Sequence, residues 1–310
     1  MEGSPIRQIA LVGFGEAGGI FGQDFAAAGL NVAAFDILLK NEYSRSGLLA
    51  KAKSAKVRPC DSLAEAVRGA DLVISAVTAS SAMDAAGSAA PFLRAGQIYL
   101  DLNSVSPDTK REIAHTLSES SATFVEAAVM AAVPPQRLKV PILLGGADAA
   151  MAAGRLQAIG LNVKPVSERI GVASAIKMCR SVVIKGLEAI AVESMFTARR
   201  YGAEEQVLES LAATFPEMGW DGELPDYLIS RVAEHGKRRA AEMREAAQAV
   251  ADAGLEPFSA LATAQLQDWL VQTIANHSLA VANGEAFSWR ELADAIAKAS
   301  SDKEEPARKS

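Results

Sequence analysis

The stretch Gly13-Phe14-Gly15-Glu16-Ala17-Gly18 decides the fold of this 310-residue chain. An apolar run, Ile9–Val12, precedes it, and residues of helical composition follow over Ala17–Ala28. A second apolar run, Val32–Phe35, leads directly into Asp36. A G-x-G-x-x-G motif between a strand and a helix, with an acid about twenty residues further on, is typical of a dinucleotide-binding βαβ unit.

Each part of this glycine loop (Gly13–Gly18) has a physical task. Gly13 permits the tight turn, Gly15 lets the backbone approach a pyrophosphate, and Gly18 lets helix and strand pack closely. The following helix offers backbone N–H groups and the positive end of its dipole to phosphates. All six residues of the loop are therefore predicted to contribute to cofactor binding.

The acid after the second run predicts which dinucleotide is bound. Asp36 is placed to accept hydrogen bonds from the adenosine ribose, and its charge would repel the extra phosphate of NADP. We expect NAD as the cofactor and NADP as the less favoured one. Lys40 and Arg45 are near enough in the sequence to leave NADP open, or they are ordinary surface charges.

Strands and helices alternate through the first half of the chain. Further apolar runs at Asp71–Val77, Gln97–Leu102, Phe124–Val129 and Pro141–Leu144 predict strands, with helical segments between the earlier ones. Repeated βα units predict a doubly wound, mostly parallel Rossmann sheet. Ligands of such a sheet bind outside the carboxyl ends of its strands. Further cofactor contacts are expected at the ends of these strands or directly after them, at Val77, Thr78 and Asn103.

Helical patterns alone follow Gly171, and the expected fold is therefore an α/β Rossmann domain followed by an all-α C-terminal domain. The expected limits are 1–165 for the dinucleotide-binding domain, 166–300 for a helical substrate and dimerisation domain, and 301–310 for a disordered tail. The helix expected at Val172–Arg200 carries more apolar surface than one small domain can cover. This predicts a homodimer that pairs the helical domains.

Composition excludes several classes of protein. The net charge is −6 with acids and bases interspersed, so nucleic acid and anionic membranes are not expected partners. No apolar run has the roughly 18 residues that span a bilayer. The two cysteines, Cys60 and Cys179, lie far apart, which favours a reducing cytoplasm. The three histidines are too dispersed to suggest a metal site.

Lys177 is the candidate catalytic residue. It stands in a small and apolar stretch, Gly171–Lys177, at the start of the long helix. A desolvated lysine could exchange a proton with a substrate hydroxyl or carbonyl while hydride moves to or from the cofactor. From the pattern alone, a lysine whose charged end reaches the surface is the alternative.

Four ordered blocks resemble the β-hydroxyacid dehydrogenase superfamily, which includes 3-hydroxyisobutyrate and 6-phosphogluconate dehydrogenases. The glycine loop is the first, and the others resemble the family's D-x-S-T-x-x-P, F-x-D-A-P-V and G-x-G-x-x-x-K blocks. They are Asp101–Pro107, Phe124–Val129 and Gly171–Lys177. The pattern is most similar to a bacterial phosphogluconate-dehydrogenase-like branch with its own helical domain. The resemblance implies that Lys177 is the acid/base and that Asn103 and Ser181 assist it.

Departures from the family pattern concern the substrate. Where the family continues S-G-G after its third block, this chain has Met130-Ala131-Ala132. The serine with which the family binds a substrate carboxylate is therefore replaced by a methionine, and a more apolar substrate is expected. The expected substrate contacts are Val129, Met130, Ala131, Arg180 and His235. For His235, with Arg238 and Glu242 on the same helix, a solvated basic helix face is the alternative.

The sequence thus predicts an NAD(P)-dependent oxidoreductase of CH–OH groups. Its substrate would be a small hydroxy or carbonyl compound, with a β-hydroxy acid among the candidates. An imine reductase-like enzyme is an alternative, which the apolar replacement of S-G-G favours and Lys177 disfavours. A dinucleotide-binding sensor without turnover is the alternative from another class.

Overall fold

The strands of the N-terminal half carry apolar side chains on both faces. In β1 (Gln8–Val12), Ile9 and Leu11 pack into one core, and the residues that follow each of them pack into another. The strands β4 (Leu72–Ser75) and β5 (Ile98–Asp101) divide their side chains in the same way. Because successive side chains of a strand point to opposite faces, this sheet needs helices on both sides.

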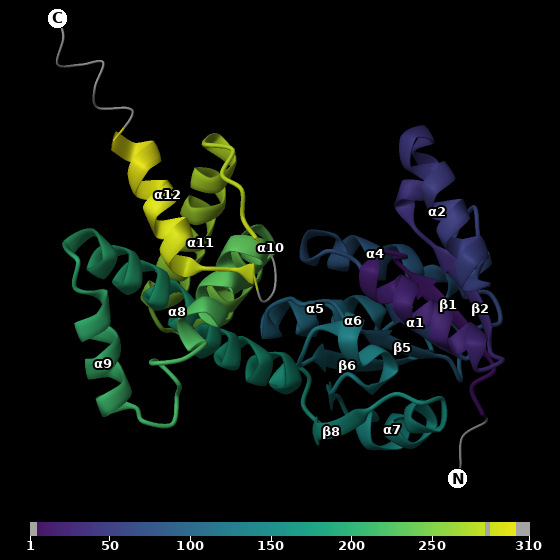
Figure 1. Ribbon diagram of the computed structural model, residues 1–310. Coiled ribbons are helices and arrows are strands. Elements are labelled where there is room, and N and C mark those ends of the chain that lie inside the picture. Colours follow the sequence, from purple (N-terminus) through teal and green to yellow (C-terminus); the bar gives the residue numbers. More distant parts are fainter. Residues whose placement is uncertain (1–4, 283–285, 302–310) are drawn as a thin grey trace, which may run out of the picture. The chain divides into compact units, whose positions relative to one another are not determined.

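The computed structural model describes residues 5–282 and 286–301, and in this part of the chain eight strands form one sheet. The strand order is β3-β2-β1-β4-β5-β6-β7-β8, and all neighbours run parallel except β6 and β7. Figure 1 labels β1, β2, β5, β6 and β8 of this sheet. The remaining strands are β2 (Asn31–Phe35), β3 (Arg58–Pro59), β6 (Thr123–Val129), β7 (Ile142–Gly145) and β8 (Val163–Ser167). The doubly wound, mostly parallel Rossmann sheet is confirmed.

Helices cover both faces of this sheet. One face packs against α1 (Glu16–Ala27), α2 (Glu42–Ala55) and α7 (Ala149–Ala158). The other packs against α3 (Leu63–Val67), α4 (Ala82–Ala89) and α5 (Pro107–Leu117). Short helical segments complete this part: η1 (Ile37–Lys40), η2 (Ala79–Ser81), η3 (Ala90–Phe92), α6 (Val133–Gln136) and η4 (Arg137–Lys139). The sequence interpretation had not included α2, α7, β3 or β8.

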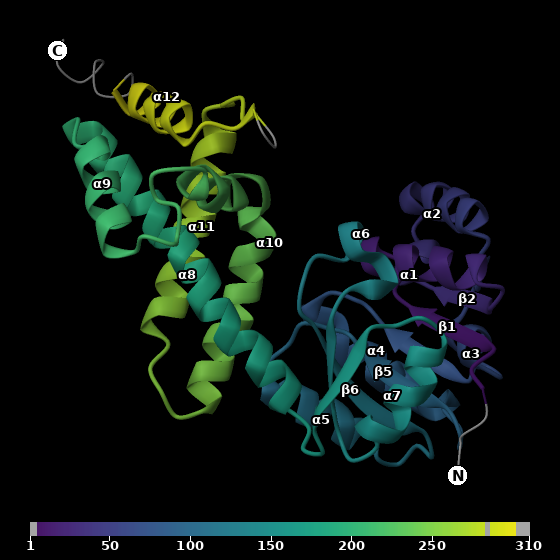
Figure 2. The ribbon, with the colours of Figure 1, turned by 60° about the horizontal axis from the view of Figure 1, so that its bottom comes forward.

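The C-terminal half is helical, as predicted. Its elements are α8 (Val172–Tyr201), α9 (Glu204–Thr214), α10 (Leu224–Asp252), α11 (Phe258–Asn276) and α12 (Trp289–Ser301). They share a separate core that includes Val192, Ile229 and Leu270. The helices α10 and α11 lie side by side (Figures 1 and 2), and no side chain fits at Gly236, because a Cβ there would lie 2.5 Å from Val271.

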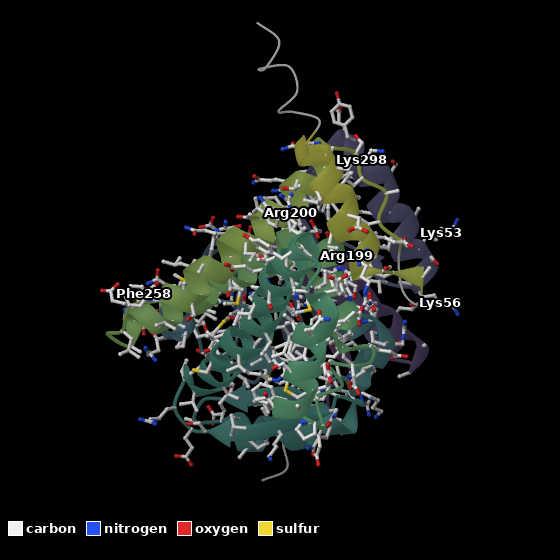
Figure 3. All side chains as sticks on the ribbon, turned by 60° about the vertical axis from the view of Figure 1, so that its left-hand side comes forward. Lys53, Lys56, Arg199, Arg200, Phe258 and Lys298 are labelled. Atoms are coloured by element: carbon white, nitrogen blue, oxygen red, sulfur yellow. The ribbon has the colours of Figure 1, made fainter. Side chains whose placement is uncertain are left out.

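An ion pair fastens the end of α8 to the last helix. The guanidinium of Arg199 donates to both carboxylate oxygens of Asp294, at 3.0 and 2.8 Å (Figure 3 labels Arg199). Ser301 is the last residue of α12, and the rest of the predicted tail, 302–310, lies outside the described residues. None of the described helices has the length and apolar composition needed to cross a bilayer.

The chain divides into two compact units, Met1–Met178 and Cys179–Ser310. The division falls within α8, so one helix contributes to both units. The domain limit expected after residue 165 lies in β8, a few residues before that helix begins. Lys177 belongs to the first unit, together with the glycine loop.

Candidate functional site

The glycine loop has the shape that a bound pyrophosphate requires. Gly13 has a φ of +95°, and a Cβ on it would lie 2.4 Å from the carbonyl oxygen of Ala76. A Cβ on Gly18 would lie 2.3 Å from the carbonyl oxygen of Gly13. A Cβ on Gly15 would meet no described atom within 4 Å, although Gly15 is the N-cap of α1. Two glycines thus allow the turn itself, and the third leaves open space above the first N–H groups of the helix.

Asp36 holds the loop in place from the end of β2. Its Oδ2 accepts the N–H of Phe14 at 2.7 Å, and its Oδ1 accepts the N–H of Leu38 at 2.9 Å. Each carboxylate oxygen can accept a further hydrogen bond. The carboxylate therefore fits a ribose with two free hydroxyls, and the residues at this edge fit a dinucleotide.

The two cations that left NADP open both have partners within the protein. The Nζ of Lys40 lies 5.7 Å from the centre of the Phe35 ring. Arg45 donates to the carbonyl oxygen of Leu39 at 2.8 Å and to Asp61 at 3.1 Å. In this arrangement the charged ends of Lys40 and Arg45 contact other groups of the protein, so neither marks a site for the extra phosphate of NADP.

Lys51, which the sequence interpretation missed, also binds the glycine loop. Its Nζ donates to the carbonyl oxygens of Phe14 at 2.9 Å and Gly15 at 2.6 Å. Burial lowers the pKa of Lys51, while the nearby charges of Asp36 and Glu16 raise it. The side chain of Lys51 passes over Gly19, where an added Cβ would lie 2.4 Å from the Cε of Lys51. No sequence signal pointed to this contact, because α2 was not predicted.

The expected cofactor contacts on the next strands are brought together around Asn103. Its Oδ1 accepts the N–H of Val77 at 2.7 Å, and its Nδ2 donates to Ser75 Oγ at 2.9 Å. The side chain is buried, so it joins the ends of β4 and β5. Thr78 is exposed, and its hydroxyl donates to Ser81 Oγ at 3.0 Å. Asn103 therefore has a structural role, because its side chain links the segment after β5 to the end of β4.

Three of the expected substrate residues, Val129, Met130 and Ala131, lie at the carboxyl end of β6 or directly after it. Val129 and Met130 are half-buried, whereas Ala131 is exposed. The N–H of Met130 donates to the carbonyl oxygen of Pro141 at 2.9 Å, so its own backbone donor is already used. A methionine side chain and small methyl groups therefore stand at the carboxyl end of this strand.

Lys177 is half-buried in the second turn of α8. That helix starts after Gly171, whose φ is +97°, and its first turn is bonded by Glu126 of β6. Ser181 is half-buried one turn beyond Lys177, and Arg180 is exposed. Helical spacing puts Lys177 and Ser181 on the same side of α8.

The remaining expected substrate residue, His235, lies in the helical unit beside a network of ion pairs. Glu242 accepts from Lys185 at 2.5 Å and from Arg238 at 2.5 Å, and Arg239 pairs with the buried Glu188. The Lys185–Glu242 and Arg239–Glu188 pairs join α8 to α10, whereas Arg238–Glu242 lies within α10. Burial lowers the pKa of Lys185 and raises that of Glu188.

His235 itself is affected by these positive charges. Burial first, and then Arg231 and Arg238, lower its pKa, and Glu234 acts against this shift. Among the described residues, no group of three or more His, Cys, Asp or Glu side chains is arranged to hold a metal ion.

The fold and this edge define a dinucleotide-binding protein of the Rossmann class. The family described as the NAD binding domain of 6-phosphogluconate dehydrogenase matches residues 8–166, and a domain of unknown function (DUF1932) matches residues 198–270. The chain belongs to the β-hydroxyacid dehydrogenase superfamily of dinucleotide-dependent oxidoreductases.

Several relatives resemble most of the chain. A conserved hypothetical protein from Sinorhizobium meliloti is 37% identical, with a TM-score of 0.79 over 96% of this chain and 98% of that one. A conserved protein of unknown function, described as structurally similar to 3-hydroxyacid dehydrogenases, is 29% identical, with a TM-score of 0.70 over 86% and 97%. A probable mitochondrial 3-hydroxyisobutyrate dehydrogenase from Dictyostelium discoideum is 25% identical over 72% of this chain and 70% of its own.

Proposed function

We propose that this chain is an NAD-dependent dehydrogenase or reductase of a small hydroxy or carbonyl compound, with Lys177 as the acid/base. The observation that carries the proposal is the position of Lys177. It is half-buried near the start of α8, and that start is bonded to Glu126 of β6 in the same compact unit as the glycine loop. A relative named for a hydroxy-acid reaction supports the same class of substrate.

In this proposal the residues of the chain bind, orient and exchange a proton. When bound, the dinucleotide supplies hydride transfer at the nicotinamide C4. The glycine loop holds its pyrophosphate, and Asp36 accepts its ribose hydroxyls and selects NAD over NADP. Lys177 takes the hydroxyl proton when the alcohol is oxidised and returns it when the carbonyl is reduced. Ser181 and Asn103 assist, the latter by fixing the strand ends beside the cofactor.

The residues after β6 favour a substrate less polar than those that S-G-G would hold. Met130 and Ala131 offer no side-chain hydrogen-bond donor to a carboxylate. Arg180, which is exposed, is the proposed partner of an anionic group, with His235 as a further contact. A β-hydroxy acid with an apolar substituent fits this combination. Imine reduction is the second candidate, favoured by the same methyl and thioether groups.

The test follows NADH formation with a panel of hydroxy acids and neutral alcohols, comparing the natural protein with Lys177→Ala. Removing the acid/base should lower kcat by roughly a hundredfold or more. Binding of NADH, followed by its fluorescence, should change by less than about twofold. Lys164→Ala, at an exposed lysine of β8, is the matched control and should keep full activity.

Equal turnover in Lys177→Ala would reject the acid/base assignment. Tight NADH binding without turnover on any acid or alcohol, but with reduction of cyclic imines, would favour the second candidate. Binding without turnover on either panel would favour a dinucleotide sensor.

We also propose that the protein is a cytoplasmic homodimer paired through the helical unit. The two cysteines are free thiols, which suits a reducing compartment. Apolar side chains of the helical unit are exposed: Ile190 by 64%, Trp269 by 47% and Phe258, at the start of α11 (Figure 3), by 77%. Trp269 lines a groove of about 800 Å³ that a second copy would cover. Light scattering at micromolar concentration should give a dimer that Trp269→Glu weakens, whereas a monomeric natural protein would contradict the proposal.

A further inference from the structure

Glu126 is a fully buried carboxylate whose two oxygens both bind the start of one helix. Its side chain projects from β6, and its relative exposure is 0%. Oε2 accepts the N–H of Gly171 and Oε1 accepts the N–H of Ser174, each at 2.6 Å. Bonds from backbone N–H groups to an ionised acceptor are among the strongest hydrogen bonds in proteins. Glu126 therefore connects the sheet to the first turn of α8.

The Glu126 carboxylate caps the N-terminus of α8, which Gly171, the residue before the helix, cannot do with a side chain. A helix N-cap usually supplies a side-chain oxygen to the N–H two or three positions further on. Here that position is Gly171, where a φ of +97° favours glycine and no side chain is present. Glu126 reaches across from the sheet and accepts the Ser174 N–H in its place. Its charge also faces the positive end of the helix dipole.

The sheet leaves a space made for this side chain. Gly145 is the antiparallel partner of Glu126 in β7, and a Cβ at Gly145 would lie 2.6 Å from Glu126 Oε2. On the other neighbouring strand, Asp101 is paired in register with Glu126 and is also fully buried. Lys110 pairs with Asp101, whereas Glu126 faces the positive end of the α8 dipole. Each of the two buried carboxylates therefore has its own positive partner.

We propose that Glu126 is the positioning residue for Lys177, an inference that rests on the proposed function of that lysine. Ser174 and Lys177 are one helical turn apart, so the point where Glu126 holds the Ser174 N–H fixes the height and rotation of the Lys177 side chain. A displacement of about 1 Å at a reacting group can cost a hundredfold in rate. Glu126 acts through the helix and touches neither substrate nor cofactor.

The test compares Glu126→Gln with Glu126→Asp. The glutamine keeps the length of the side chain but replaces one acceptor by a donor, whereas the aspartate keeps the charge but is too short to reach both N–H groups. Glu112→Gln, at an exposed position of α5, is the matched control. Three quantities are measured: hydrogen exchange of the Gly171 and Ser174 amides, kcat beside the Kd for NADH, and the pH profile of Lys177 acetylation by acetic anhydride.

We expect Glu126→Gln to speed exchange at both amides by about tenfold or more, because a charge-assisted bond is lost. It should lower kcat by about tenfold or more with the Kd for NADH unchanged, and it should shift the Lys177 acetylation profile. Glu126→Asp should lie between the glutamine variant and the natural protein. Faster amide exchange with kcat and the acetylation profile both unchanged would overturn the proposal, since Glu126 would then only stabilise the fold. Unchanged exchange would overturn the capping itself.

Gly145→Ala tests the same proposal in a second way, because it should displace the Glu126 side chain without changing its chemistry. Its methyl group should displace Glu126 and reproduce the changes in amide exchange and Lys177 acetylation. Gly154→Ala, where a Cβ would have no atom within 4 Å, is the control and should change neither. Lysine acetylation also separates this proposal from the proposed function. If Lys177→Ala keeps its turnover, the acid/base role fails, whereas control of Lys177 by Glu126 is still decided by the acetylation profile.

Discussion

The Nζ of Lys110 lies 3.1 Å from the Oδ2 of Asp101, the last residue of β5, and both side chains are buried. Lys110 also donates to the backbone carbonyl oxygen of Asp101 at 2.9 Å. Asp101 Oδ1 in turn accepts the N–H of Asn103 at 3.0 Å. The pair thus supports the turn from which Asn103 reaches the end of β4.

Removing one member of this pair should destabilise the fold. Lys110→Met leaves the charge of Asp101 buried without its partner, which costs about 3–5 kcal/mol of unfolding free energy. Urea unfolding measures the change. Arg58→Ala is the control, because the Arg58–Glu65 pair is exposed and should contribute about 0–1 kcal/mol. Similar losses in the two variants would contradict the prediction.

The glycine loop predicts that two alanine substitutions have different effects. Gly15→Ala adds a methyl group in open space, so its melting temperature should stay within about 2 °C of the natural value. Its affinity for NADH should fall by about tenfold or more, because the methyl group occupies the approach of the pyrophosphate. Gly18→Ala should lose both binding and several degrees of stability, since its Cβ meets the Gly13 carbonyl oxygen. Normal NADH binding by Gly15→Ala would exclude this loop as the pyrophosphate site.

Asp36→Asn should weaken the proposed preference for NAD over NADP. The carboxylate charge that repels a ribose phosphate is removed, while one oxygen acceptor remains. The ratio of the Kd for NADPH to the Kd for NADH should fall by about tenfold or more, since like charges brought together at a binding site cost several kcal/mol. Fluorescence titrations with both reduced cofactors measure it. An unchanged ratio would mean that another residue determines cofactor choice.

The two cysteines should differ strongly in reactivity. Burial raises the pKa of the Cys60 thiol to about 11, and its side chain is almost fully buried, whereas Cys179 is exposed. At pH 8 only about one Cys60 thiol in a thousand would be the reactive thiolate. Iodoacetamide should therefore label Cys179 and leave Cys60 unmodified until the protein unfolds, as peptide mass spectrometry can show. Early labelling of Cys60 in the folded protein would disprove this.

His235 should make the protein less stable in mild acid. Its pKa is lowered from 6.5 by burial and by neighbouring arginines, so the folded state binds fewer protons than the unfolded chain below that pH. Stability is therefore retained above about pH 6.5 and falls as the pH drops toward the lowered pKa. Between pH 7.5 and 5, the natural protein should lose more unfolding free energy than His235→Gln. The difference should be at most about 1 kcal/mol, because the side chain is 37% exposed. Equal pH dependence in the two proteins would refute the shift.

The sequence predicted those parts of the fold whose residues carry a local pattern. Strands buried on both faces appear as short apolar runs, and the glycine loop has a fixed spacing. The helix α2 carries no such signal, because only Ala52 and Ala55 of its fourteen residues are buried. In β8, Lys164 and Pro165 are exposed, which interrupts the apolar run expected of a strand.

The same limit applies to the candidate site. The residues of the glycine loop, Asp36 and Lys177 could be chosen from motifs and spacing. Lys51 and Glu126 could not be assigned their contacts, because they act on backbone groups 36 and 45 residues away in the chain. Side-chain bonds to distant backbone atoms leave no periodicity in a sequence, so only the folded structure reveals them.

The close approach of Gly145 to Glu126 also limits the order in which this family can change. Any side chain at position 145 collides with the carboxylate, so a substitution there is harmful while Glu126 is present. Once position 126 has become shorter, the space opens and position 145 is free to vary. Homologues should therefore carry either the long acid with glycine opposite it or a smaller residue with a wider choice at 145, a dependence between two strands that single substitutions would not disclose.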